Sequence, residues 1–385
     1  MNRNRAYPPL LPALAAAVFI MSALFLAWNA LSGDTIRVAA VVPATGGAAL
    51  SNQPTLEGYR IAVRELNEAG GLLGREVELL EYDAQSTPLG SDRAARQAVK
   101  DGVLAILGPA WSSHALPVAK VAQAHGIPML NNIATHPDIP LVGDYVFRVC
   151  FNDLFQGEVM ARFALEHLHA TTAALAVDIT SDFSLSLAKE FRDNFLKNGG
   201  TILLETYYKP KQLDPVATAK ALEDSGAEVC FIPGHDESGA IVKTLSRRGS
   251  AIIPLGGDGW EGESFLEKGG KTARIGYYCS HWSPDLPDPR TRRFRADYEY
   301  MGNLTASMAL SYDAVYLLAD AIRRAGAPDR EAVRDALAAT MDFQGLTGSI
   351  TMDENGEPAK QAVILKVENG LVSYFKIVPP TTPGQ

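Results

Sequence analysis

The chain has 385 residues, of which 47% are hydrophobic and 21% are charged, and its formal net charge is −9. This composition is typical of a globular protein, and the length is too great for one ordinary core, so we expect two lobes of roughly 150 residues each. The acidic balance, which becomes −11 when Arg3 and Arg5 are left out, excludes a protein that binds nucleic acid or anionic lipid through a basic surface.

Residues 1–33 predict export. Arg3 and Arg5 precede an apolar run from Leu10 to Trp28, after which small residues follow. This order is the layout of a secretory signal peptide. The apolar run is also nearly long enough to span a bilayer, so a retained N-terminal anchor stays open as the alternative. In both cases we expect the rest of the chain to be periplasmic or otherwise extracytoplasmic.

From Ile36 onward, apolar runs of strand length alternate with amphipathic helical stretches. Ile36–Val42 is continuous in valine and alanine, which is typical of a strand buried on both faces. A helix follows and stops at Gly70-Gly71. Further strands are predicted over Val77–Tyr82, Leu104–Leu107 and from Pro128–Leu130, with helices over Ser91–Lys100 and His114–His125. This rhythm predicts a parallel sheet with helices on both faces.

The same rhythm restarts in the second half. Strands are predicted over Ala173–Val177, Thr201–Glu205, Val229–Ile232 and Ile252–Leu255, with helices over Ser186–Asn198, Pro215–Ser225 and Ser238–Arg248. Later helices are predicted over Arg290–Tyr300, Ala309–Arg324 and Arg330–Met341, and a turn at Asn355-Gly356 precedes two hairpin-like strands, Ala362–Val367 and Val372–Ile377. The pattern as a whole indicates an α/β fold of two doubly wound parallel-sheet lobes.

The joining segments are expected near Val149–Asp153 and Tyr277–Trp282. The predicted map assigns 1–33 to the signal peptide or anchor, 36–149 and 281–345 to lobe I, 152–278 and 347–378 to lobe II, and 379–385 to a tail. Cys150 and Cys279 fall on the joining segments, so we expect them to be neighbours at the hinge, either bonded or as two free thiols. Cys230 lies in an apolar run, which indicates a small core residue.

Ligands of open parallel sheets bind beyond the carboxyl ends of the strands. Six loops occupy that position: Pro43–Asn52, Gly108–Ser113, Asn131–Pro137, Thr180–Ser184, Pro233–Glu237 and Gly256–Glu263. They contain conspicuous polar and aromatic residues, and this shared position predicts a binding site.

Individual residues in these loops have more than one interpretation. Ser112 and Ser113 precede a helix, so one of them is expected to cap it while the helix N-terminus binds a carboxylate. Trp111 is either a core aromatic or a ring over the ligand. Asp258 lies between glycines and is either a turn residue or the counter-ion of an ammonium group.

No catalytic constellation is present: the sequence has no G-x-S-x-G, Walker, H-E-x-x-H or G-x-G-x-x-G motif in the required context. His235-Asp236-Glu237 superficially suggests a metal site, but adjacent loop residues rarely face one ion. We therefore expect no metal and no cofactor.

Four parts of the chain share an order and spacing with a known family. They are Leu66–Gly74 followed by Glu81–Asp83, Gly108–Ser113, Gly126–Leu130, and Asn131–Thr135. They resemble the branched-chain amino-acid binding proteins, the type I periplasmic solute-binding proteins of ABC importers. The resemblance runs from about Ile36 to Ile377. It implies two lobes joined by a three-segment hinge, a small-molecule ligand in the cleft between them, and importer membrane subunits as partners.

The resemblance also implies which residues would bind an amino acid. Ser112 falls on the serine that holds the ligand carboxylate, and Thr135 falls on the threonine that contacts both charged groups. Ile133 falls on the residue whose carbonyl binds the ammonium, and Ala134 lies between them. Asp258 falls on the acidic residue that pairs with the ammonium, where many members have glutamate.

Some positions depart from the family. Phe183 falls on a lobe II aromatic that is usually tyrosine, and another family aromatic falls near Gly234, so that wall is either absent or supplied by His235. Trp111 is bulkier than usual. These departures favour a ligand with a different or larger side group than leucine. The predicted ligand-binding set is Trp111, Ser112, Ile133, Ala134, Thr135, Phe183 and Asp258.

We therefore predict a monomeric, non-enzymatic solute-binding component of an ABC importer, which binds an amino acid or similar small carboxylate by hinge closure. Two alternatives remain open. A retained anchor would favour a membrane-tethered ligand-sensing domain. An exported α/β enzyme would need a nucleophile and a base that meet in the cleft, and the sequence shows no such set.

Overall fold

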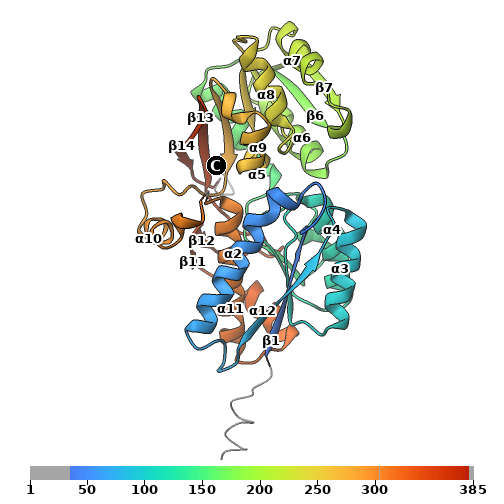
Figure 1. Ribbon diagram of the computed structural model, residues 1–385, viewed down its shortest axis with the longest axis vertical. Coiled ribbons are helices and arrows are strands. Elements are labelled where there is room, and N and C mark those ends of the chain that lie inside the picture. The colour runs from blue at the N-terminus through green and yellow to red at the C-terminus, as the bar shows by residue number, and fades with distance from the viewer. Residues whose placement is uncertain (1–34, 303, 381–385) are drawn as a thin grey trace, which may run out of the picture.

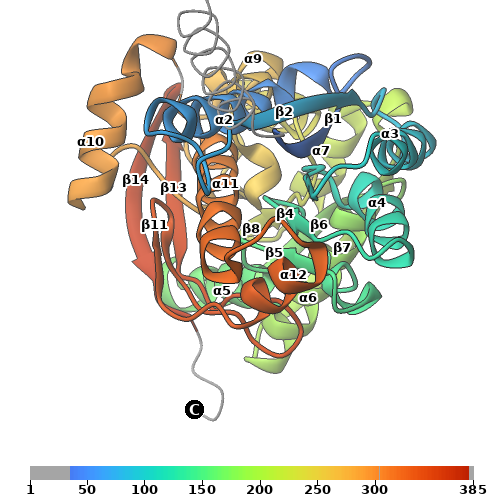
Figure 2. The same cartoon turned by 90° about the horizontal axis from the view of Figure 1, so that it is seen from below.

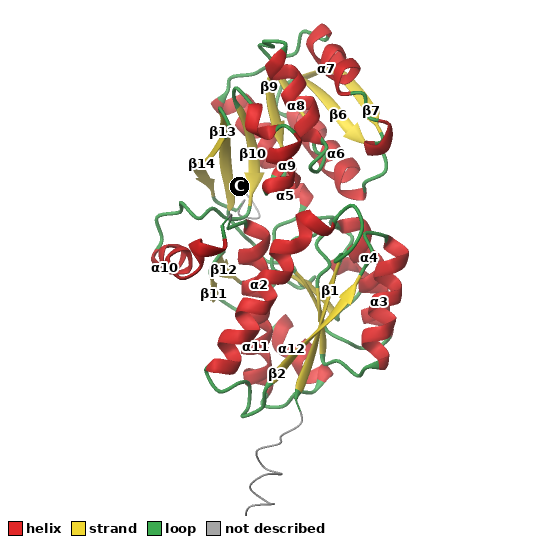
Figure 3. Ribbon diagram, in the orientation of Figure 1, coloured by secondary structure: helices red, strands yellow, loops and turns green. Residues whose placement is uncertain are grey.

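The structure, a computed structural model, describes residues 35–302 and 304–380. The predicted signal peptide or anchor (1–33) and residues 381–385 of the predicted tail lie outside this part. Within it, no helix combines the length and the apolar character needed to cross a membrane. Two bodies, each built on its own sheet, lie end to end along the long axis (Figures 1 and 3). We call the body with the five-stranded sheet lobe I and the body with the seven-stranded sheet lobe II.

Lobe I is a parallel sheet covered on both faces. Its strands, in the order β2-β1-β3-β4-β5, are β2 (Val77–Asp83), β1 (Ile36–Val42), β3 (Ala105–Leu107), β4 (Met129–Asn131) and β5 (Val146–Arg148). One face is covered by α2 (Ala49–Glu68), α11 (Ala306–Ala325) and α12 (Arg330–Ala338), and the other by α3 (Pro88–Lys100) and α4 (Ser112–Ala124) (Figures 1 and 2). Alternate side chains of β1, such as Val38 and Val41, enter the two different cores, which explains its continuous apolar sequence.

Lobe II repeats this plan and adds an antiparallel hairpin. Its strands, in the order β7-β6-β8-β9-β10-β13-β14, are β7 (Thr201–Tyr208), β6 (Thr172–Asp178), β8 (Val229–Phe231), β9 (Ile253–Gly256), β10 (Gly276–Ser280), β13 (Ala362–Glu368) and β14 (Leu371–Val378). The first five are parallel, and β13 and β14 are antiparallel to their neighbours. The helices are α5 (Asp153–Arg162), α6 (Asp182–Lys197), α7 (Pro215–Asp224), α8 (Ser238–Arg247) and α9 (Glu263–Lys268).

The strand order places the binding loops. In both lobes the second strand of the chain lies on one side of the first strand and the third strand lies on the other, as β2-β1-β3 and β7-β6-β8 show. The loops that follow the first and third strands therefore diverge and leave a crevice between them, which is where open α/β sheets bind ligands. The fold thus offers two such crevices, one in each lobe.

The chain passes between the lobes three times: after β5, after β10, and between β12 (Gly348–Ile350) and β13. These passages form the predicted three-segment hinge. The first and third are held together at Arg148, whose guanidinium donates to Glu357 at 2.7 Å and is fully buried. The amide of Asn152 donates to the other carboxylate oxygen of Glu357 at 2.5 Å. A buried ion pair with these additional hydrogen bonds fixes the two segments side by side.

Three details refine the predicted map. β10 pairs with both β9 and β13, so the second passage begins after Ser280, in the last part of the predicted segment Tyr277–Trp282. β12 pairs with β11 (Phe343–Gly345), and Ile350 packs in the lobe I core, so the predicted end of lobe I at residue 345 is too early. A turn does lie at Asn355-Gly356, but β13 and β14 are joined by Asn369-Gly370, where both φ angles are positive.

All three cysteines lie in the described part of the chain and are buried, free thiols. Cys150 packs in the core of lobe I, and Cys279 lies in β10 between its two partner strands. Residues close to them in sequence do meet, since the ring of Phe151 stacks on the imidazole of His281 with 3.7 Å between centroids. The two passages are therefore adjacent, and no disulfide joins Cys150 to Cys279.

Candidate functional site

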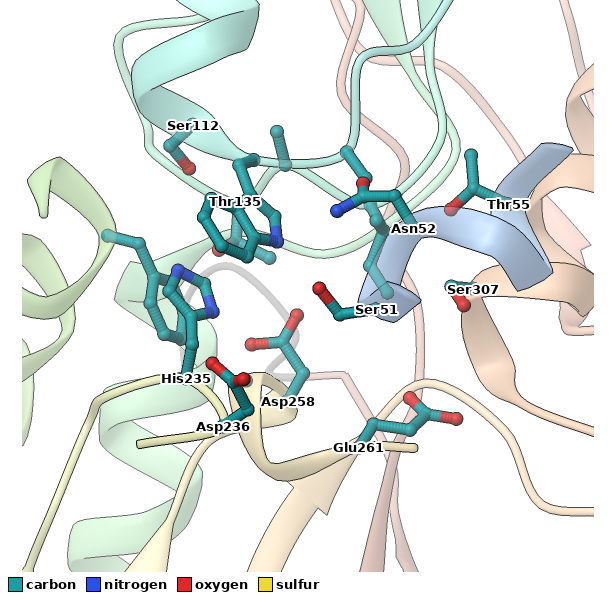
Figure 4. Close-up of a pocket in the computed structure, with 16 residues that line it drawn as sticks. Ser51, Asn52, Thr55, Ser112, Thr135, His235, Asp236, Asp258, Glu261 and Ser307 are labelled. Atoms are coloured by element: carbon teal, nitrogen blue, oxygen red, sulfur yellow. The ribbon is translucent and has the colours of Figure 1, made fainter. Parts of the chain in front are cut away.

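A pocket of about 590 Å³, including the open solvent at its mouth, lies between the lobes where their loops face each other. Each of the six loops identified in the sequence contributes to its wall, and α2 and α11 add residues (Figure 4). All seven predicted residues line it: Trp111, Ser112, Ile133, Ala134, Thr135, Phe183 and Asp258. The lining residues outside the predicted set are Ser51, Asn52, Thr55, Ala110, His235, Asp236, Gly259, Glu261 and Ser307.

Ser112 is the first residue of α4, and this helix has no side-chain cap. The expectation that Ser112 or Ser113 caps the helix is therefore wrong. The Ser112 hydroxyl instead accepts a hydrogen bond from the backbone N–H of His136 at 3.2 Å. The first N–H groups of a helix have no intrahelical partner, and the helix dipole makes this end electropositive. The start of α4 is thus a suitable position for a carboxylate.

The loops around Ser112 are held by buried polar side chains. The Asn131 amide donates to the carbonyl of Pro109 at 2.6 Å and accepts from the N–H of Ala134 at 2.7 Å, so it ties the loop after β3 to the loop after β4. Behind the second loop, Arg148 donates to the carbonyls of Ala134 and His136 at 3.2 and 2.9 Å. The lobe I side of the pocket is therefore attached to the hinge.

Asp258 lines the pocket from lobe II, and the residue is only 8% exposed to solvent. Its carboxylate accepts from the Gln156 amide at 3.0 Å and lies 3.1 Å from Nε2 of His281. Burial lowers the pKa of His281, while Asp258 opposes this effect, so the imidazole is a neutral donor to the carboxylate. Gln156 and His281 fix the Asp258 carboxylate in place, and Phe151 covers the His281 ring.

Two further carboxyl groups lie close by, half-buried Glu261 and fully buried Asp153. Burial, with a smaller contribution from Asp258, raises the pKa of Glu261 to about 8. The Glu261 side chain accepts from the backbone N–H of Ala306 and from the Ser280 hydroxyl. Burial likewise raises the pKa of Asp153 to about 7; its carboxylate is fully buried at the start of α5 and has no donor in good hydrogen-bonding geometry. This side of the pocket therefore carries more acidic groups than the sequence suggested.

An aromatic stack closes one end of the pocket. The indole of Trp111, from lobe I, lies 4.4 Å from the imidazole of His235, from lobe II, with 6° between the planes. His235 also stacks on Phe183 at 5.0 Å, and Trp111 stacks on His114 at 5.5 Å. Trp111 thus lies at the cleft, as its loop position indicated, and His235 supplies the wall that the sequence left open.

The three residues His235, Asp236 and Glu237 point to different partners. His235 joins the aromatic stack, Asp236 pairs with Lys268, and Glu237 accepts from the Tyr208 hydroxyl at 2.9 Å. Within residues 35–302 and 304–380, no group of acidic, histidine or cysteine side chains is arranged to hold a metal ion.

Comparisons with known proteins agree with this geometry. A family model described as periplasmic binding protein matches residues 35–370. The Leu/Ile/Val-binding protein BraC3 of Rhizobium johnstonii is 29% identical over 345 residues, which cover 88% of this chain and 93% of the relative. A leucine-, isoleucine-, valine-, threonine- and alanine-binding protein of Pseudomonas aeruginosa is 26% identical and covers 85% of this chain and 88% of its own length.

Two solved structures share the whole fold. The leucine-binding protein LivK of Thermotoga maritima superposes with a TM-score of 0.85 at 31% identity, covering 90% of this chain and 99% of its own. The protein LivJ of Streptococcus pneumoniae, in complex with isoleucine, gives 0.84 at 28% identity, covering 90% and 100%. Since the family model spans nearly the whole described chain and the lobes have this topology, the chain belongs to the periplasmic binding protein family and has its type I fold.

Proposed function

We propose that this protein is the solute-binding component of an ABC importer and that it binds an α-amino acid between its lobes. One observation carries the proposal: the pocket pairs the uncapped start of α4 in lobe I with the buried carboxylate of Asp258 in lobe II. An electropositive helix end and a fixed carboxylate on opposite walls are complementary to the two charges of a zwitterion.

In the proposed binding mode, the N–H groups at the start of α4 and the Ser112 hydroxyl hold the ligand carboxylate. The Ile133 carbonyl, the Thr135 hydroxyl and Asp258 hold the ammonium group. Lobe I contributes most of these groups and captures the ligand first, after which rotation about the hinge brings Asp258 onto it. Ligand binding thereby selects the closed form, which the membrane subunits recognise.

The remaining parts of the proposal follow from the sequence and the relatives. Residues 1–33 direct export, and the protein acts as a monomer outside the cytoplasm and catalyses no reaction. The relatives named above are binding proteins. A membrane-tethered sensor would use the same pocket and differ only in keeping its N-terminal segment, so N-terminal sequencing of the exported protein distinguishes the two.

The proposal is tested by calorimetric titration with the twenty common L-amino acids and with matched carboxylic acids and amines that lack one of the two charged groups. We expect at least one amino acid to bind, and its deaminated and decarboxylated analogues to bind much more weakly. Equal binding of the analogues, or no amino-acid binding at all, would contradict the proposed function.

A further inference from the structure

The half of the pocket next to α2 and α11 is rich in hydrogen-bond acceptors. Ser51, Asn52 and Thr55 on α2 and Ser307 on α11 line this half together with Glu261 (Figure 4). Among the described residues that line the pocket, none is a lysine or arginine. This half is therefore suited to a ligand group that donates hydrogen bonds.

The carboxylates of the pocket exceed what a zwitterion requires. Asp236 is already paired with Lys268, and the proposed binding mode assigns Asp258 to the α-ammonium group. Glu261 then has no cationic side chain as a partner: it accepts hydrogen bonds from the backbone N–H of Ala306, the first residue of α11, and from the Ser280 hydroxyl. When the lobes close over an amino acid with an apolar side chain, this carboxyl group is enclosed without a cationic partner and has to stay protonated.

Asn52 provides an independent observation. Its side chain is 1% exposed, and its amide nitrogen donates to the Ala48 carbonyl at 2.8 Å. The amide oxygen has no hydrogen-bond partner, and Asn52 lines the pocket. A buried acceptor without a donor is uncommon and unfavourable. A ligand N–H group in this half of the pocket would satisfy it.

We propose that Glu261 and Asn52 form a subsite for a cationic nitrogen, so that the ligand is an α-amino acid whose side chain ends in an ammonium or guanidinium group. This inference rests on the proposed function, because it requires the α-carboxylate and α-ammonium groups to be held by the start of α4 and by Asp258. The hydroxyls of Ser51 and Ser307 complete the subsite, since they accept hydrogen bonds from the same cation. A neutral amide side chain would satisfy Asn52 but would leave Glu261 uncompensated.

Binding of a cationic ligand should also release a proton from Glu261 to the solvent. Burial raises the pKa of Glu261 to about 8, so the empty site carries mostly the protonated acid at pH 7. The titratable groups nearest to it are Asp258, Tyr278 and, beyond Asp258, His281, and none of them supplies a positive charge at this pH. A bound cation favours the carboxylate and lowers its pKa. A basic amino acid therefore releases up to one proton at pH 7, and its affinity rises as the pH increases toward 8.

The experiment is calorimetric titration of the full chain with L-lysine, L-ornithine and L-arginine, compared with L-leucine and L-glutamine, at pH 7 in buffers of different ionisation enthalpy. At least one basic amino acid should bind about tenfold or more tightly than leucine and glutamine, with proton release. Glu261→Gln should weaken its binding at least tenfold, abolish the proton release and leave leucine binding unchanged or stronger. Glu267→Gln, an exposed change on α9, is the matched control and should alter nothing.

Asn52→Leu gives a second test that does not depend on Glu261. It should reduce the affinity for the basic ligand and increase the affinity for leucine, because the unpaired amide oxygen is replaced by an apolar group. Tighter binding of leucine or glutamine to the parent protein, or basic-ligand binding that survives Glu261→Gln, would overturn the inference while leaving the proposed function intact. The absence of binding by any α-amino acid would overturn the proposed function itself.

Discussion

Trp111 and His235 stack nearly parallel, with 4.4 Å between ring centroids and 6° between planes, although they belong to different lobes. They lie 124 positions apart in the sequence, after β3 and β8, which are the corresponding third strands of the two sheets. The contact forms only when the lobes come together, so it reports the closed arrangement.

The first prediction follows from this contact. Ligand addition should change the fluorescence of Trp111, because closure places the His235 ring over the indole. Trp260 and Trp282 are fully buried within the lobes and should contribute little to the change. Trp111→Phe should therefore abolish the signal. His235→Ala should weaken ligand binding by roughly 2- to 10-fold, since an aromatic pair contributes about 0.5–1.5 kcal/mol. An undiminished signal in Trp111→Phe would contradict the assignment.

The second prediction concerns Asp258. Asp258→Asn keeps the shape of the side chain but leaves the ligand ammonium without a charged partner in a closed site. Loss of one partner of a buried pair costs about 3–5 kcal/mol, so the dissociation constant should rise by roughly two to three and a half orders of magnitude in calorimetry. Asp224→Asn, at an exposed ion pair on α7, should leave it unchanged. Equal affinity in Asp258→Asn would exclude this carboxylate as the ammonium partner.

The third prediction uses the buried carboxyl group of Asp153. Burial raises its pKa to about 7, whereas an aspartate in the unfolded chain titrates near 3.9. The unfolded chain therefore loses this proton first, and the free energy of unfolding falls as the pH rises from about 4 to 7. Asp153→Asn removes this decrease. The free energy of unfolding of the variant minus that of the parent should therefore be about 2–3 kcal/mol larger at pH 8 than at pH 5.

Urea denaturation at the two pH values measures this difference in the absence of ligand. Asp224→Asn serves as the control, because its carboxylate is exposed. Parallel pH dependence in the parent and in Asp153→Asn would show that the carboxyl group is not held in its neutral form.

The fourth prediction concerns the thiols. Burial raises the pKa of Cys150 to about 12, and it raises the pKa of Cys230 and Cys279 as well. All three should therefore react very slowly with a thiol reagent in the folded protein. Unfolding without reductant should release three reactive thiols per chain. A count of one would mean that Cys150 and Cys279 are joined by a disulfide.

The sequence was most informative where the pattern is local. The strand-and-helix rhythm predicted the sheets, and the rule that ligands bind beyond strand ends predicted six loops, all of which reach the pocket. Helix α5 and strand β5 were not predicted, because the region between 146 and 162 is short and lacks a clear period. Gln156 lies on α5 and was missed for that reason.

Other site residues could not have been predicted from local pattern at all. Gln156 contacts Asp258 across 102 positions of sequence, and His281 contacts it across 23, and neither residue type indicates such a role by itself. Asn52 and Glu261 lie inside two of the predicted loops, so the sequence alone already indicated that they are near the site. What marks them is the unpartnered amide oxygen of one and the burial of the other, and both properties arise only from tertiary packing.

The position of β13 beside β10 determines when this protein is able to fold. The last two strands of the seven-stranded sheet come from residues 362–378, near the end of the chain. Lobe I likewise needs α11 and α12, which end at residue 338. A chain that crosses a membrane from its N-terminus therefore cannot complete either lobe until most of it has emerged. Until β13 arrives, β10 is an open edge strand able to pair with another chain. Truncation before residue 362 would make that exposed edge permanent, so such products should aggregate rather than persist as a shorter, two-lobed protein.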